Sequence, residues 1–434
     1  MKRRVMLLGL AGLIAACGDI ASIPEQETWG PNPRLGEIRR SLIPTVHVAE
    51  AQGWPAGAQP RAPQGWRVTA FATGLDHPRW LYVLPNGDVL VAESNKPQSA
   101  DEKEHHKIRA FFMGLFQKKA GAGVPSADRI TLLRDADGDG VAETKGALID
   151  HLRSPFGMVL LGDQLYIANA DAIVKVPFKP GDMRAGAPTQ VTGLPAGINH
   201  HWTKNILASR DGSKLYATVG SNSNVGENGL PAEEGRAAIW EVDVATGAKR
   251  LFASGLRNPN GLAWEPTSNA LWTVVNERDE IGSDLVPDYL TSVQDGAFYG
   301  WPWSYWGQHV DARPDPPNPQ KVAAAKVPDY ALGNHVAPLG LAFSDGKLPS
   351  PFVSGAFVGE HGSWNRKPFA GYKVVFVPFE GGKPRGLPVD FLTGFLSADG
   401  KAWGRPVGVV LDGKGGVLVA DDVGNAVWRV APAR

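Results

Sequence analysis

Cysteine is almost absent from this sequence, which contains Cys17 as its single thiol in 434 residues. An intramolecular disulfide is therefore excluded, and so is thiol catalysis by any other residue. An excess of either sign of charge is also lacking, because 44 lysine and arginine side chains balance 44 aspartate and glutamate side chains. A protein without a basic excess has no general attraction for nucleic acid, so we expect no nucleic-acid partner.

Long apolar runs and the familiar catalytic motifs are missing as well. The apolar run at residues 5–16 is too short to span a bilayer. There is no nucleophile elbow, no zinc-binding His-Glu-x-x-His pair, no phosphate-binding loop and no Gly-x-Gly-x-x-Gly turn. Nicotinamide binding on a doubly wound sheet therefore has no support.

The N-terminus has the features of an exported protein. Three cations at residues 2–4 precede the apolar run, which ends in Ile-Ala-Ala before Cys17 and resembles a bacterial lipobox. We expect residues 1–16 to be a lipoprotein signal peptide and Cys17 to carry the lipid; a plain secretory signal is the alternative. Because Gly18 rather than aspartate follows, we expect attachment to the outer membrane on the periplasmic side of a bacterial cell envelope.

The next segment has no regular hydrophobic period. Residues 17–65 are rich in proline, glycine, alanine and glutamine, a composition that predicts a flexible tether between the lipid and the folded body. Removing residues 1–16 leaves 41 cationic and 44 anionic side chains, so the mature chain carries a net charge of −3.

The remaining chain, residues 66–434, repeats one pattern six times. Each copy has a polar lead-in, an alternating apolar strand, a turn of Gly, Asp or Asn and a second apolar strand. The copies cover residues 74–92, 152–168, 201–218, 255–274, 336–358 and 404–420. Their spacing exceeds that of compact propeller repeats, so some loops must be long. The pattern predicts an all-β, six-bladed β-propeller of four-stranded antiparallel blades, with long loops on one face and a functional site at the central channel.

Two segments interrupt the repeats. Residues 104–119 place five large apolar side chains at helical spacing beside lysine and arginine, and we expect a helix that caps the propeller; a membrane-surface helix is the alternative. Asp135, Asp137 and Asp139 form the first half of an EF-hand-like loop. The twelfth position is Gly146 rather than glutamate, with Glu143 as a substitute ligand, so a structural Ca²⁺ and an ordinary acidic turn both remain open.

Several motifs resemble a known family. Residues 255–261 (GLRNPNG), 276–284 (NERDEIGSD) and 296–302 (GAFYGWP) are similar to linked segments of soluble glucose dehydrogenases that use pyrroloquinoline quinone. Residues 359–366 (GEHGSWNR) and 135–140 (DADGDG) are closer to the sorbosone and pyranose dehydrogenase branch. The chain from about residue 66 onward thus resembles the glucose/sorbosone dehydrogenase family, which implies the same propeller.

The resemblance also implies a cofactor site. Pyrroloquinoline quinone is planar and carries three carboxylates, which guanidinium groups bind in two-point fashion. Family matching places Arg257, Asn258 and Arg405 on cofactor-binding positions, and Arg366 or Lys367 on another because the local alignment slides between them. Arg257 is further expected to help hold the negative charge of the reduced cofactor during catalysis.

Sugar oxidation needs a base that takes the hydroxyl proton as the hydride leaves, and histidine suits this near neutral pH. The resemblance places His201 in that role, with His200 as the alternative. It also places Ca²⁺ on the main-chain carbonyls of Asp279 and Glu280, with Asp284 nearby, where the ion would polarise the quinone.

We therefore expect quinone-dependent oxidation of an aldose, pyranose or sorbosone-type sugar to a lactone or acid, with electrons passing to an external acceptor. Two other classes remain open at this point. A calcium-dependent propeller lactonase would need the metal but no quinone, and a non-catalytic propeller that binds protein or glycan would need neither.

Overall fold

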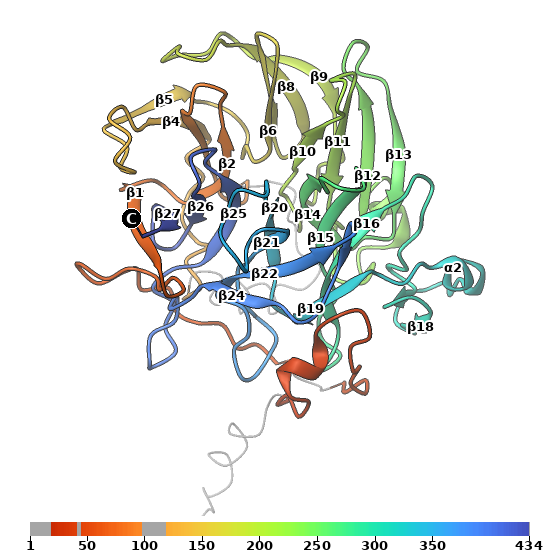
Figure 1. Ribbon diagram of the computed structural model, residues 1–434. Coiled ribbons are helices and arrows are strands. Elements are labelled where there is room, and N and C mark those ends of the chain that lie inside the picture. The colour runs from red at the N-terminus through yellow and green to blue at the C-terminus, as the bar shows by residue number, and fades with distance from the viewer. Residues whose placement is uncertain (1–18, 41–44, 98–118, 434) are drawn as a thin grey trace, which may run out of the picture.

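A computed structural model describes residues 19–40, 45–97 and 119–433 of the chain. Six antiparallel sheets stand side by side around a ring, with their first strands innermost (Figure 1). The expected six-bladed β-propeller is confirmed, because each predicted repeat supplies the two inner strands of one blade.

The first three blades are each built from four consecutive strands. Blade 1 contains β2 (Pro78–Val83), β3 (Val89–Glu93), β4 (Arg129–Arg134) and β5 (Thr144–Ile149). Blade 2 contains β6 (Met158–Leu161), β7 (Gln164–Ala168), β8 (Ala172–Pro177) and β9 (Thr189–Gly193). Blade 3 contains β10 (Ile206–Ala208), β11 (Lys214–Val219), β12 (Ala238–Asp243) and β13 (Lys249–Ser254).

The last three blades are less regular. Blade 4 contains β14 (Asn258–Trp264), β15 (Leu271–Asn276), β16 (Pro287–Val293) and β19 (Tyr330–Asn334). Blade 5 contains β20 (Pro338–Phe343), β21 (Gly355–Glu360), β22 (Lys373–Glu380) and β24 (Val389–Leu392), with β23 (Lys383–Pro384) as a small extension. Blade 6 contains β25 (Pro406–Leu411), β26 (Val417–Asp421) and β27 (Ala426–Pro432), and its fourth strand comes from the other end of the domain.

That fourth strand, β1 (Trp66–Thr73), closes the ring. It pairs antiparallel with β27, so the first and last strands of the propeller share one sheet. The hydrogen bonds of β1 therefore join the two ends of the domain, and neither end can leave without opening blade 6. The smaller elements are η1 (Glu25–Thr28), η2 (Leu230–Glu233), α2 (Pro319–Ala324), β17 (Ser304–Tyr305) and β18 (His309–Val310).

Glycine allows the inner strands to approach one another around the ring. At four junctions a glycine lies at or beside the start of an inner strand, where an added Cβ atom would come closer than 3.0 Å to the next blade. These contacts join Gly157 to Asn205, Gly261 to Leu341, Gly340 to Val407, and Gly408 to Arg79. At the other two junctions Trp80 packs on Phe156 with ring centroids 5.0 Å apart, and Asn205 Nδ2 donates to the Asn260 carbonyl.

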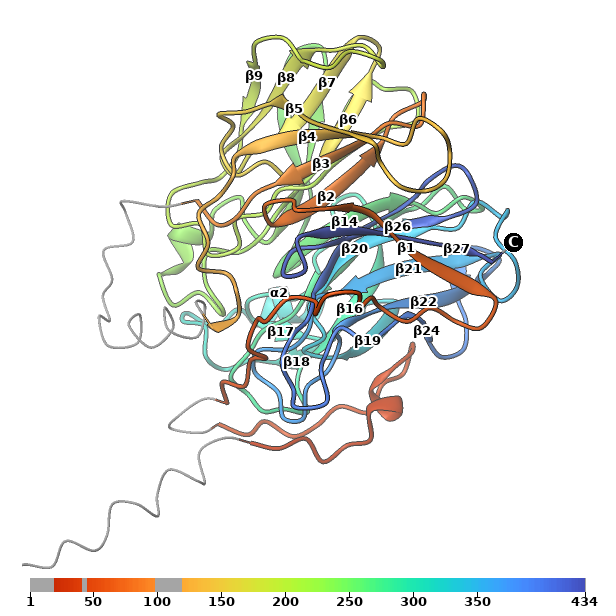
Figure 2. The ribbon, with the colours of Figure 1, turned by 90° about the vertical axis from the view of Figure 1, so that its left-hand side faces the viewer.

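Residues 19–40 and 45–54, which we call the N-terminal strap, differ from the expected flexible tether. Thr28 and Ala49 are each 1% exposed, and the strap forms bridges to blade 5 and to the loops before blade 6. Figure 2 shows residues 19–40 in red along one edge of the body. Many of their donors and acceptors are satisfied by residues more than 200 positions away in sequence, which composition cannot reveal.

Some expectations fall on residues that are not described. The signal peptide, Cys17 and nearly all of the expected helix at 104–119 lie outside the described ranges. Within those ranges, no helix combines the length and apolarity that a membrane crossing requires.

Candidate functional site

The lead-in loops of the inner strands carry three of the predicted site residues. His201 precedes β10, Arg257 precedes β14 and Arg405 precedes β25, so each enters from a different blade. All three are at least partly withdrawn from solvent, and Arg257 and Arg405 are 3% and 1% exposed. Buried arginines require partners or a bound anion, which makes their contacts informative.

Ser221 connects His201 to Arg257. The Ser221 N–H donates to the Arg257 carbonyl at 2.7 Å, and the Ser221 carbonyl lies 2.9 Å from His201 Nδ1. Because a carbonyl can only accept, Nδ1 carries the hydrogen and Nε2 keeps its lone pair. Burial, together with the positive charge of Arg257, holds the pKa of His201 well below its ordinary value. The imidazole is therefore neutral and basic at Nε2 near neutral pH.

Asn258 lies beside the same histidine. A Cβ atom on Gly220 would come within 2.5 Å of both Asn258 Oδ1 and His201 Cβ, so only glycine allows blades 3 and 4 to bring these two side chains together. Asn258 Oδ1 is buried without a hydrogen-bond partner. His200, the alternative base, is exposed, and its ring meets His201 edge to face.

Arg257 is fixed by its own blade and by the preceding one. Its guanidinium donates to the Asn224 and Glu277 carbonyls, to Asn224 Oδ1 and to Asp279 Oδ2 at distances of 2.6 to 3.2 Å. These bonds engage four of its five N–H groups. Burial opposes ionisation of Asp279, but Arg257 and His335 hold its pKa at about 2. Arg257 therefore keeps a fixed orientation with one donor to spare.

A second charged group comes from blades 1, 5 and 6 and was not predicted from the sequence. Asp422 accepts from Arg79, and its Oδ2 lies 2.9 Å from His361 Nε2 and 3.5 Å from His77 Nε2. Burial opposes ionisation here too, but these neighbours hold the pKa of Asp422 well below its ordinary value. In two other repeats the lead-in supplies Arg257 and Arg405. The lead-in of the first repeat ends in His-Pro-Arg-Trp, and this parallel could have indicated Arg79 from the sequence.

Arg405 belongs to this second group, and Trp202 links the two groups. Arg405 donates to the Tyr372 hydroxyl at 2.9 Å, and its charge lowers the pKa of His361 and of His77, on which burial has the largest effect. Trp202, next to His201, has the Arg79 guanidinium 5.7 Å from its ring centroid. The charged residues of five blades are thus connected around the channel.

The remaining cofactor candidates, Arg366 and Lys367, lie in the loop between β21 and β22. Arg366 is 3% exposed and donates to the Pro368 carbonyl, and acidic residues from the strap and from blade 4 face it. Lys367 is partly exposed, and its backbone N–H lies 3.4 Å from Ser283 Oγ. Of the two alternatives, Arg366 has the buried guanidinium that a carboxylate site requires.

The expected calcium residues of blade 4 are engaged with other partners. The Asp279 carbonyl accepts from Asn224 and Arg313, so a cation there would have to displace two donors. Asp284 is 4% exposed, and its carboxylate accepts from the N-terminal strap. Glu280 has a positive φ of 72° and is half-buried. The structure thus places these three residues in one loop, between β15 and β16.

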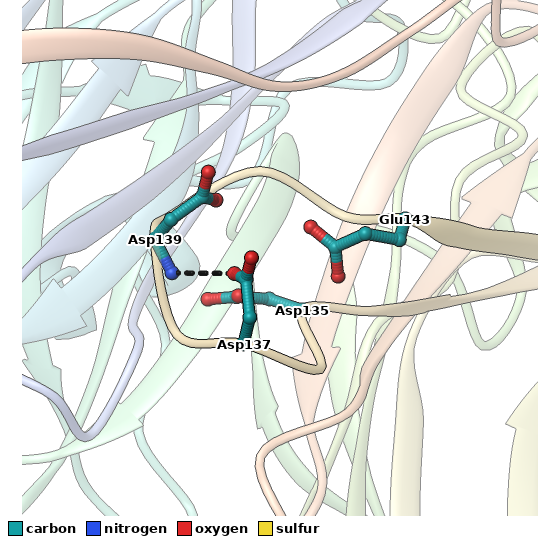
Figure 3. Close-up of side chains that lie close together, drawn as sticks. All are labelled: Asp135, Asp137, Asp139 and Glu143. Atoms are coloured by element: carbon teal, nitrogen blue, oxygen red, sulfur yellow. Dashed lines mark hydrogen bonds between the residues drawn. The ribbon is translucent and has the colours of Figure 1, made fainter.

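The acidic loop between β4 and β5 is more open. The carboxylates of Asp135, Asp137, Asp139 and Glu143 offer oxygens that all lie within 4.8 Å of one another (Figure 3). Lys414 Nζ lies 3.4 Å from Asp135 Oδ2 and supplies part of the balancing charge. This loop is on the turn side of blade 1, apart from the lead-in loops.

Unpartnered buried atoms indicate what the channel mouth can accommodate. The Nε atoms of Arg79, Arg366 and Arg405 are buried and lack a hydrogen-bond partner among the described residues. Such donors favour an anion with several oxygens. The donor set therefore fits a flat polycarboxylate such as pyrroloquinoline quinone.

Comparison with known proteins agrees with this geometry. Residues 128–289 and 320–433 match the model of a family described as TrAA12-like. The chain belongs to that family. This TrAA12-like protein is 24% identical over 381 residues to a pyrroloquinoline quinone-dependent pyranose dehydrogenase from Coprinopsis cinerea, covering 75% of this chain but only 46% of that enzyme. The family expected from the motifs is confirmed.

Solved structures show the same propeller. The holo form of the PQQ domain of the Coprinopsis cinerea pyranose dehydrogenase superposes with a TM-score of 0.67 at 21% identity, over 89% of this TrAA12-like chain and 100% of that domain. The calcium structure of a Trichoderma reesei family AA12 protein gives 0.69 at 18% identity, over 90% and 99% of the two chains. At these identities the comparison defines the fold.

Proposed function

We propose that this protein oxidises a sugar of the aldose, pyranose or sorbosone type, with pyrroloquinoline quinone as its bound cofactor. The observation that carries the proposal is the pairing of a neutral histidine with buried, partly unpartnered arginines at one channel mouth. The names of the relatives support the same chemistry, since they include a quinone-dependent pyranose dehydrogenase.

The arginines would hold the cofactor. Arg405 and Arg366 each have an unpartnered Nε for a carboxylate, and Asn258 offers a free carbonyl oxygen beside His201. Arg79, which the sequence did not reveal, adds a third free Nε. Arg257 keeps one N–H donor, and its fixed positive charge would stabilise negative charge that develops during oxidation.

His201 would take the proton. The Ser221 carbonyl holds Nδ1–H, so Nε2 is free to accept the hydrogen of a sugar hydroxyl while the hydride leaves the same carbon. When bound, the quinone supplies the hydride acceptor for this two-electron oxidation. The products are a lactone or acid, and the electrons pass to an external acceptor.

We extend the proposal to metal and location. Ca²⁺ is the expected ion, either as Lewis acid near the quinone or as a structural ion at the acidic loop of Asp135 to Glu143. The lipobox-like residues at the N-terminus support a location on the periplasmic side of the outer membrane, with attachment through Cys17.

The test is reconstitution. Purified apo-protein is titrated with the quinone, with and without Ca²⁺, and dye reduction is followed across a panel of aldoses, pyranoses and sorbosone. The proposal predicts turnover only when the quinone is present. Turnover of a lactone without quinone would instead indicate a hydrolase. Asp137→Asn distinguishes an ion at the acidic loop from an ion near the quinone. The variant should lose the rise in melting temperature that Ca²⁺ binding at the acidic loop causes, and should keep the effect of Ca²⁺ on turnover.

A further inference from the structure

The N-terminal strap contacts each of three loops that carry candidate cofactor residues. In blade 4, Ser22 donates its N–H and its hydroxyl to Asp284 Oδ2 at 2.7 and 2.8 Å. The fit is close, because a Cβ atom on Gly36 would lie 2.7 Å from Asp284 Cβ. This loop also carries Asp279, which orients Arg257.

The second contact is with the loop of Arg366. His47 Nδ1 lies 3.0 Å from the Arg366 carbonyl, and the His47 ring stacks on Phe369 with centroids 3.9 Å apart. The His47 N–H donates to the Trp364 carbonyl. The strap therefore binds the backbone of this loop on both sides of the arginine.

The third contact reaches Arg405 through one carboxylate. Trp54 Nε1 donates to Asp421 Oδ2 at 2.6 Å, and Asp421 Oδ1 accepts the Arg405 N–H at 2.8 Å. Trp54 also packs edge to face on Phe395 and Trp428. Loss of the indole donor would loosen the carboxylate that fixes the Arg405 backbone.

We propose that the strap is a positioning element for the cofactor site: it fixes the loops of Asp279, Arg366 and Arg405 relative to one another, and so sets the affinity for the quinone. This inference rests on the proposed function. The physical reason is that the three loops belong to different blades, so that a shared brace reduces the freedom they would lose on binding.

The test uses the full-length chain with Ser22→Ala, His47→Ala and Trp54→Phe combined. These changes remove side-chain contacts of the strap and leave every candidate cofactor residue in place. We expect the dissociation constant for the quinone, measured by titration, to rise about tenfold or more. At saturating quinone, kcat should stay within about twofold of the wild-type value, because the reacting groups are unchanged.

Arg34→Ala is the matched control. Its side chain lies on the same strap but pairs only with exposed Glu27, so quinone affinity should not change. If the combined variant folds poorly, His47→Ala alone is used in its place. We then expect a smaller rise in the dissociation constant for the quinone.

Amide hydrogen exchange on the apo-protein gives a readout that does not need the quinone. Residues 277–286 and 361–369 should exchange faster in the combined variant than in wild type and the Arg34→Ala control. Unchanged exchange together with unchanged affinity would overturn the inference. If wild type binds no quinone, the proposed function fails, and exchange alone decides whether the strap holds these loops.

Discussion

The Nδ1 atom of His201 lies 2.9 Å from the main-chain oxygen of Ser221, and the Ser221 N–H in turn donates to the carbonyl of Arg257. One backbone unit therefore fixes the tautomer of the candidate base and its position relative to the nearest cation. This geometry favours His201 over exposed His200 as the candidate base.

Replacement of His201 by alanine should lower kcat by a factor of about 10² to 10⁴, the usual contribution of a general base. Quinone affinity should change little, since no arginine is removed. His200→Ala is the control and should retain most of the wild-type rate. Dye reduction at saturating quinone distinguishes the two variants. Full activity in His201→Ala would show that another group takes the proton.

The pH profile should show an acid limb. Burial and the charges of Arg257 and His200 lower the pKa of His201 well below 6.5, so the neutral base is present at and above that pH. The rate constant kcat/KM should be flat above about pH 6.5 and fall at lower pH, as protonation removes the Nε2 lone pair. A wild-type midpoint above 6.5 would contradict the assignment.

Arg257→Lys should weaken both folding and cofactor binding. Lysine keeps the charge but cannot reproduce the four hydrogen bonds, which leaves the Asn224 and Glu277 carbonyls short of a donor. We expect a loss of about 2 kcal/mol or more in the free energy of unfolding, measured in urea. Arg250→Lys is the control, because that guanidinium is half-exposed and its ion pairs with Glu241 and Asp295 lie at the surface.

Gly340→Ala should destabilise the ring. The added Cβ atom would lie 2.2 Å from the Val407 carbonyl, so blades 5 and 6 would have to separate. We expect a loss of about 1 to 3 kcal/mol or more in urea unfolding. Gly146→Ala tests the same change at β5, where the nearest atom would be Met183 Cε at 4.0 Å, and should cause no loss.

The blades could be predicted from the sequence because their signal is local. Each repeat contains its own lead-in, inner strands and turn, and the six copies match the six pairs of inner strands. Arg257, Arg405 and His201 were assigned from the resemblance to a family, and each lies in the lead-in of a repeat. The recurring glycines, among them Gly261 and Gly340, could also be seen in the sequence. Their role in the packing between blades could be seen only in the structure.

The parts that could not be predicted depend on distant contacts. Ser22 meets Asp284 across 262 residues, so a segment with tether-like composition gains a defined position. The partners of the Asp279 carbonyl are side chains of Asn224 and Arg313, which no local pattern relates to it. Asp422 follows the inner strands of the last repeat and meets histidines of blades 1 and 5, a convergence that only ring closure creates.

The contact between Asp19 and Ser283 would limit how far a lipid-anchored form of the protein could stand from a bilayer. Ser283 donates its N–H to Asp19 Oδ2 and its hydroxyl to the Asp19 carbonyl, which fixes the chain two residues after Cys17. Two residues extend at most about 7 Å. A lipid on Cys17 would therefore hold the blade 4 loop close to the headgroups.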